Sequence, residues 1–161
     1  MNEIIPKDDV EQLKFILNHV KGQSYIDCVH EVQDFMINNL NTLEMKPIHH
    51  FGPNIYMRQL DVGAGTMVVS KMHKTEHFGI MLKGSMTVLT ETGIELVEAP
   101  QIIKTSVGTK RVVYFHEDSS FLTIHPTSET NLDKIESEVI VPLEDEKLFL
   151  ESKGGLACLG G

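Results

Sequence analysis

Cysteines and long apolar runs are scarce in this chain of 161 residues, and their scarcity excludes several classes of protein. The two cysteines, Cys28 and Cys158, lie in a helical pattern and in a glycine-rich segment, and neither has a second cysteine nearby. We therefore expect neither a structural disulfide nor a cysteine zinc site. No stretch approaches the roughly 20 apolar residues of a membrane span, and the N-terminus lacks the basic and apolar segments of a secretory signal. The expected location is the cytoplasm, without a membrane partner.

Positive charge is also scarce, since 14 lysines and arginines stand against 23 aspartates and glutamates, for a formal net charge of −9. Nucleic-acid binding depends on neutralising phosphates, so this balance argues against a nucleic-acid partner. A glycine-rich phosphate loop, the nucleophile elbow of hydrolases and a paired-cysteine motif are absent as well. What remains is a composition of 41% hydrophobic and 23% charged residues, which is typical of one soluble globular domain.

The N-terminal part of the chain has the periodicity of helices. One helix is predicted within residues 8–22, where apolar residues recur on one face. A second is predicted from Ser24 to about Asn39. Ser24 is its expected cap, and Asp27 three residues later completes a pattern like a capping box.

From about residue 54 the period becomes that of strands. Short segments rich in valine, isoleucine, threonine and aromatic residues, such as "TMVVSKMH", "HFGIMLKG" and "KRVVYFH", are separated by glycine, proline and acidic turns. Many short strands predict a mainly β fold, an antiparallel sandwich or barrel. After Pro126 the helical pattern returns, and Asn131 is the expected cap of a short helix.

These patterns divide the chain into three parts. We predict a helical N-terminal extension over residues 1–48, and a barrel with its following short helix over residues 49–142. Residues 143–161 are acidic and then glycine-rich, and we expect either a docked arm or a mobile tail there.

One stretch combines glycines and histidines at a distinctive spacing. Gly65, Lys71, His73, His77 and Gly84 fall at the positions of a motif that runs glycine, histidine, histidine, glutamate, glycine. The motif resembles the first conserved motif of the cupin superfamily. Lys71 replaces the first histidine of that motif and His77 replaces its glutamate, so the metal-ligand pattern is changed at two of three positions.

A second segment extends the resemblance to about residues 54–127. Gly108 matches the turn glycine of the second cupin motif, and Arg111 stands where that motif has a metal-binding histidine. The chain departs from the motif at Pro100, Ser106 and Phe115. The resemblance implies a double-stranded β-helix, the jelly-roll barrel of cupins. The chain also looks like small cupin-like proteins encoded by bacteriophages, which would place it in the host cytoplasm or the virion.

Strand alternation predicts which basic side chains meet. Lys71 and His73 share one face, which points into the barrel in the cupin register, and His77 begins the next strand and faces them. Arg111 starts a strand that turns at residues 117–119 and returns as "SFLTIH". A three-residue turn in such a hairpin would place His125 across from Arg111.

Three interpretations of this cluster stay open. In the one we favour, Lys71, Arg111 and His125 contact a small anionic ligand that carries a carboxylate or phosphate. No metal is bound in that case, and His73 and His77 supply acid–base catalysis. In the second, His73, His77 and His125 bind one divalent transition metal in a metal-dependent enzyme. In the third, the protein is a non-catalytic assembly or virion component, or a phage protein that sequesters a ligand.

The sequence leaves open whether the protein is an enzyme. Cupins commonly associate through their sheets, so the resemblance implies a homo-oligomer, either a dimer or a larger assembly.

Overall fold

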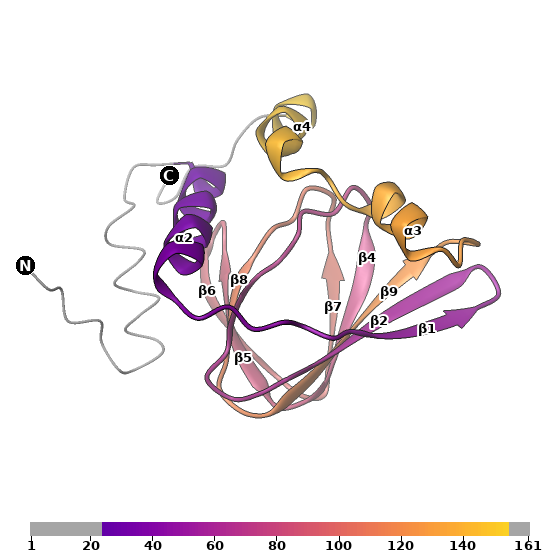
Figure 1. Ribbon diagram of the computed structural model, residues 1–161, viewed down its shortest axis with the longest axis horizontal. Helices are drawn as coiled ribbons and strands as arrows, with labels where there is room; N and C mark the ends of the chain where they lie inside the picture. Colours follow the sequence, from indigo (N-terminus) through magenta and orange to yellow (C-terminus); the bar gives the residue numbers. More distant parts are fainter. Residues whose placement is uncertain (1–23, 155–161) are drawn as a thin grey trace, which may run out of the picture.

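Two antiparallel sheets face each other in the structure, a computed structural model that describes residues 24–154 (Figure 1). The order of the five-stranded sheet is β1-β2-β9-β4-β7, and that of the four-stranded sheet is β3-β8-β5-β6. The strands are β1 (Ile48–Gly52), β2 (Ile55–Val62), β3 (Met67–Val69), β4 (His77–Lys83), β5 (Ser85–Thr90), β6 (Gly93–Glu98), β7 (Gln101–Thr105), β8 (Val112–Phe115) and β9 (Ser119–Pro126).

The strand order is that of a jelly roll. Strands β2 and β9, which are far apart in sequence, pair in one sheet, and β3 and β8 pair in the other. The strands that lie between β3 and β8 in the sequence pair with each other in the same nested way, β4 with β7 and β5 with β6. Such nested pairing of eight strands in two sheets is the jelly-roll arrangement found in cupins. The predicted mainly β, double-stranded β-helix fold is therefore confirmed.

Helices precede and follow the strands of the barrel in the sequence. They are α2 (Tyr25–Asn39), α3 (Leu132–Val139), a 3-10 helix (Leu143–Asp145) and α4 (Glu146–Ser152). Ser24 caps α2 by accepting a hydrogen bond from the Asp27 amide, and Asn131 caps α3 through the Lys134 amide. Both caps were predicted from sequence. The other predicted helix, within residues 8–22, lies outside the described residues.

Helix α2 covers the outer face of the four-stranded sheet, beside β8 and β6 in Figure 1. Cys28 and Val29 have no exposed surface and pack with Leu89 of β5 and Val112 of β8. The Tyr25 hydroxyl lies 2.8 Å from the carbonyl oxygen of Leu89 and 2.7 Å from that of Lys110, and these two oxygens share its one donated proton. Cys28 is a free, buried thiol, and Cys158 lies outside the described residues. None of the helices in residues 24–154 combines the length and apolar character needed to span a bilayer.

The predicted hairpin between the strands that start at Arg111 and end at His125 is wrong. Strand β8 lies in the four-stranded sheet and pairs with β3 and β5, whereas β9 pairs with β2 and β4 in the opposite sheet. Residues 116–118 therefore connect the two sheets. The short turn suggested a hairpin, but the hydrogen-bonding partners of both strands come from distant parts of the chain.

The described part of the predicted tail is helical and docks on the barrel. Glu146 begins α4 and accepts hydrogen bonds from the Lys110 ammonium group at 2.9 and 3.1 Å. The side chains of both residues are only 2% exposed. Of the two alternatives for this segment, residues 143–154 follow the docked arm.

Candidate metal centre and ligand cavity

Three histidines from separate segments meet at one end of the barrel. His73 lies in the irregular segment after β3, His77 is the first residue of β4, and His125 is near the end of β9. The ring centroids are 4.2 Å apart for His73 and His77, 4.6 Å for His77 and His125, and 5.5 Å for His73 and His125. We call these three residues the histidine cluster.

The pairing of β4 with β9 brings two members of the histidine cluster together. Phe78 pairs with Ile124, and the next residues outward on the two strands are His77 and His125. Because side chains alternate along a strand, both rings point inward while Phe78 points out. The register that the sheet adopts, rather than a local motif, therefore places these two rings side by side.

Residues that follow α3 hold the third member in place. His73 forms an antiparallel bridge with Ile140. On either side of it, the Val141 amide donates to the Met72 carbonyl at 2.9 Å and the Lys74 amide donates to the Val139 carbonyl at 2.8 Å. The loop that carries His73 is thus fixed by backbone hydrogen bonds to the segment after α3.

Burial keeps the histidine cluster neutral. His77 is 5% exposed and His125 is 2% exposed. Desolvation, together with the neighbouring imidazoles and the Arg58 charge, lowers the pKa of His73 to about 3 and that of His125 to about 4. The pKa of His77 is lowered as well, again chiefly by burial. At neutral pH all three rings are neutral, which is the form that binds a metal ion.

The free nitrogen atoms of the histidine cluster fit a divalent transition metal. Nδ1 of His77 lies 3.2 Å from the Thr75 carbonyl oxygen, so it carries the proton and leaves Nε2 free. Nε2 of His125 contacts the Thr123 hydroxyl at 3.2 Å, and the buried Nδ1 of His125 has no hydrogen-bond partner among residues 24–154. One nitrogen from each ring can be chosen so that all lie within 4.8 Å of one another. A buried ring nitrogen without a partner is costly, and in the tautomer that leaves Nδ1 of His125 without a proton, coordination to a metal would satisfy it.

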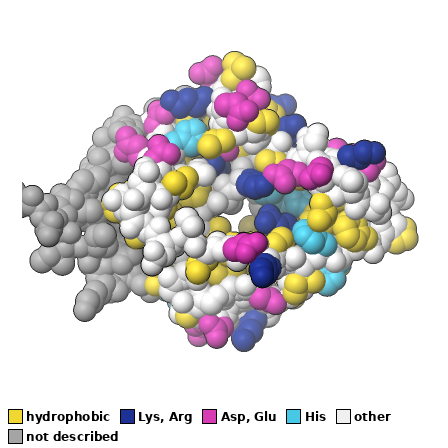
Figure 2. Space-filling view, viewed as in Figure 1, with side chains coloured by type: hydrophobic (Ala, Val, Ile, Leu, Met, Phe, Trp, Pro, Cys, Tyr) yellow, Lys and Arg dark blue, Asp and Glu magenta, His cyan; other side chains and the backbone are white. Residues whose placement is uncertain are grey.

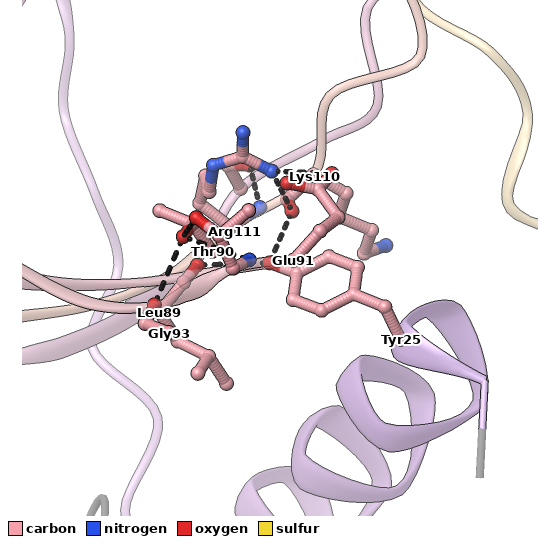
Figure 3. A network of polar contacts seen from close by, with 9 residues as sticks. Tyr25, Leu89, Thr90, Glu91, Gly93, Lys110 and Arg111 are labelled. Carbon is pink, nitrogen blue, oxygen red and sulfur yellow. Dashed lines mark hydrogen bonds and ion pairs between the residues drawn. The ribbon is translucent and has the colours of Figure 1, made fainter. Parts of the chain in front are cut away.

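The two cations that the sequence assigned to an anion are paired with carboxylates. Lys71 forms an ion pair with Glu136 of α3 at the surface. Nη1 of Arg111 contacts Oε1 of Glu91 at 2.9 Å, and the guanidinium lies 5.9 Å from the centre of the Tyr25 ring (Figure 3). Both residues border the cavity, but their charged groups are paired with these carboxylates and not with the histidine cluster.

Arg58 is a cavity residue that the sequence analysis missed. It lies on β2 between Tyr56 and Leu60, on the inward face, and pairs in register with Thr123. It is half-buried, and its charge acts on His73 and His125. No carboxylate within residues 24–154 forms an ion pair with it. The same two-residue alternation that placed Lys71 and His73 could have identified it, once β2 was oriented by Tyr56.

A cavity of about 870 Å³ occupies the barrel between the two sheets. His73, His77 and Arg58 line one side of it, and Arg111 and Glu91 border it on the other side. Figure 2 shows a hollow near the middle of the molecular surface in that view, bordered by basic, acidic and histidine side chains. The volume is in the range of cavities that bind small organic molecules.

No family model matches the sequence, and no curated protein matches it. Solved structures with a similar fold include KdgF from a Halomonas species, at 12% identity and a TM-score of 0.47, over 59% of this chain and 90% of that one. A cupin 2 domain-containing protein from Halorhodospira halophila shares 14% identity at a TM-score of 0.44, over 61% of this chain and 80% of the other. A cupin-2 domain containing protein from Shewanella frigidimarina shares 13% identity at a TM-score of 0.41, over 59% of this chain and 91% of the other.

These similarities transfer no activity to the chain, since fold alone does not fix function. The strand order by itself makes this a jelly-roll barrel protein.

Proposed function

We propose that the barrel binds one divalent transition metal ion through the histidine cluster and holds a small anionic molecule beside it. The observation that carries the proposal is the convergence of three neutral imidazoles, with one buried nitrogen, Nδ1 of His125, that lacks a partner in residues 24–154. Imidazole nitrogens suit zinc, iron, nickel and copper, and three protein ligands are typical of metal sites that keep an open position.

The low pKa values favour metal ligation over the acid–base role that the sequence suggested for His73 and His77. A general base works best when its pKa is near the operating pH, and a histidine with a pKa of about 3 is a weak base. A metal ligand has the opposite requirement, because a proton on the ring competes with the metal.

Arg58 is the side chain that supports an anionic ligand. A half-buried guanidinium is expensive without a counter-charge, and a carboxylate or phosphate can make two parallel hydrogen bonds with it. When bound, the metal would supply Lewis acidity at the same anion. The proposal therefore moves the anion-binding role from Lys71 and Arg111, which are paired with Glu136 and Glu91, to Arg58.

The other expectations from the sequence stay predictions. They are the homo-oligomer, the cytoplasmic or virion location, the bacteriophage origin and the assembly or sequestering role. Light scattering on the purified protein would measure the oligomeric state directly.

Elemental analysis tests the metal site. We expect protein purified without chelator, or stripped and then titrated with Co²⁺, to bind one equivalent of metal. His77→Ala and His125→Ala should each lower the affinity for Co²⁺ at least tenfold, because each removes one of three ligands. His50→Ala is the matched control, since His50 is an exposed histidine of β1 outside the cluster.

Two results would contradict this proposal. One is the absence of stoichiometric binding of Co²⁺, Zn²⁺, Fe²⁺, Ni²⁺ and Mn²⁺ by folded protein. The other is binding that His77→Ala and His125→Ala leave unchanged.

A further inference from the structure

The inner face of the five-stranded sheet changes from polar to apolar along the barrel axis. At the first level, Tyr56 pairs with His125, next to His77. Two residues further along each strand, Arg58 pairs with Thr123. Another two residues inward, each level being roughly 7 Å from the last, the inward-facing side chains are apolar. They are Leu60, Phe121 and Met81.

The four-stranded sheet faces these levels with an apolar wall. The side chains that it contributes to the cavity are mainly aliphatic or aromatic, namely Val68, Val88, Val113, Met86, Val97 and Phe115, and the polar Thr90 and Glu95 line the cavity beside them. Val68 and Val113 are only half-buried although they point into the barrel. Because both side chains line the cavity, their exposed apolar surface is available for a ligand to cover.

Gly79 extends the apolar surface beneath Arg58. It lies between Thr123 and Ile103 in the sheet register, on the inward face of β4. A Cβ atom at this position would lie 2.6 Å from Cζ of Phe121. The Phe121 ring therefore fills the space that a side chain at position 79 would take, and an aromatic ring lies directly below the level of Arg58.

We infer that the ligand is an amphipathic carboxylate, whose carboxylate group is held at the histidine cluster and Arg58 and whose apolar chain or ring lies along Leu60, Phe121 and the opposite wall. This inference rests on the proposed function for the position of the carboxylate. A sugar acid of similar size would place hydroxyl groups against the apolar wall without hydrogen-bond partners, which is costly. The inner part of the cavity therefore selects for an apolar body.

Calorimetric titration of the full-length, metal-loaded protein with a series of carboxylates tests the inference. The probes are the sodium salts of acetate, butyrate, hexanoate and octanoate, with gluconate as a polar carboxylate. We expect the association constant to rise about fourfold for each methylene from butyrate to octanoate, because each buried methylene adds apolar area. Gluconate should bind no more tightly than acetate.

Two variants separate the head of the ligand from its body. Arg58→Gln should weaken acetate and octanoate alike, by about tenfold or more, because it removes a charged hydrogen-bond donor. Val113→Thr keeps the shape of the wall and adds a hydroxyl, so it should weaken octanoate about fivefold and leave acetate unchanged. Val88→Thr serves the same purpose if the first wall variant does not fold. Lys134→Gln, on the exposed side of α3, is the control.

The outcomes separate this inference from the proposed function when metal content is measured on the same samples. If metal is bound and the association constants of the carboxylates do not depend on chain length, the amphipathic ligand is overturned and the metal site stands. The same holds if metal is bound and gluconate binds more tightly than the other probes. An association constant that rises with chain length and that Arg58→Gln lowers for every probe, in protein that holds no metal, would uphold the ligand class and overturn the metal site.

Discussion

Gly84 joins β4 to β5 in a backbone conformation that a side chain would strain. Its φ is +85°, in the left-handed region, and a Cβ atom there would lie 2.9 Å from the Asp118 carbonyl oxygen and the Ser119 Cα. Both neighbours are backbone atoms of the connection to β9, so they cannot move aside as the end of a flexible side chain could. Gly84 is also the glycine that closes the cupin-like motif in the sequence.

Replacing this glycine should destabilise the fold. We expect Gly84→Ala to lower the free energy of unfolding by more than about 1 kcal/mol, because it adds both backbone strain and a steric clash. Gly63→Ala is the control. Gly63 does not have a left-handed φ, and the nearest atom to its added Cβ is a side-chain oxygen of Asp118 at 3.9 Å. Thermal unfolding followed by circular dichroism would measure both, and equal losses would contradict the argument.

At the scale of elements, one buried carboxylate joins three parts of the molecule. Glu146 of α4 binds Lys110, which precedes β8, and its Oε2 lies 2.6 Å from Nε2 of His30 in α2. Desolvation makes such a pair a weak source of net stability, but removing one partner leaves an uncompensated buried charge. The Lys110–Glu146 pair therefore ties α4 to the barrel.

Breaking this pair from one side should cost more than replacing both partners. We expect Glu146→Gln to lower the free energy of unfolding by about 3–5 kcal/mol, because the Lys110 ammonium group stays buried. The double variant Lys110→Met with Glu146→Leu should recover a large part of that loss. Urea denaturation would measure both, with Glu144→Gln, an exposed residue of the neighbouring 3-10 helix, as the control. A double variant as unstable as the single one would sink this explanation.

At the scale of the whole molecule, the groups buried between α2 and the barrel make the free energy of unfolding fall at alkaline pH. Burial raises the pKa of the Tyr25 hydroxyl well above its ordinary value and raises the pKa of the Cys28 thiol to about 11. The unfolded chain loses these protons near pH 9 for the thiol and near pH 10 for the phenol. The folded protein keeps them, so above about pH 9 it holds more protons than the unfolded chain.

Stability should therefore be fully present below about pH 9 and fall as the pH rises towards 11. Guanidinium unfolding at a series of pH values would show this decline. Tyr25→Phe removes one of the two groups, so its curve should be less stable at pH 7 and should fall less steeply between pH 10 and 11. Identical slopes for the two proteins would show that the buried hydroxyl of Tyr25 does not cause the decline.

Local patterns were enough for the fold class and for several element boundaries. The caps Ser24 and Asn131 accept hydrogen bonds from amide groups three residues away. The left-handed φ of Gly84 is also a local property of that residue. Strand alternation is likewise a property of adjacent residues. These signals need no knowledge of distant partners, which is why the sequence predicted the mainly β barrel, the helices that flank it and His73 and His77 as neighbouring inward residues.

Strand pairing between distant segments determined the rest. His125 meets His77 because β9 pairs with β4, and not because a hairpin places it opposite Arg111. Pairing likewise placed Arg58 beside Thr123 in the cavity, without a carboxylate partner in the described residues, while docking of α3 brought Glu136 to Lys71. The sequence by itself determined the barrel and the inward position of His73 and His77. Only the tertiary structure decided which cations are neutralised and which three imidazoles meet, because ion pairs and ligand sets depend on contacts between segments far apart in the chain.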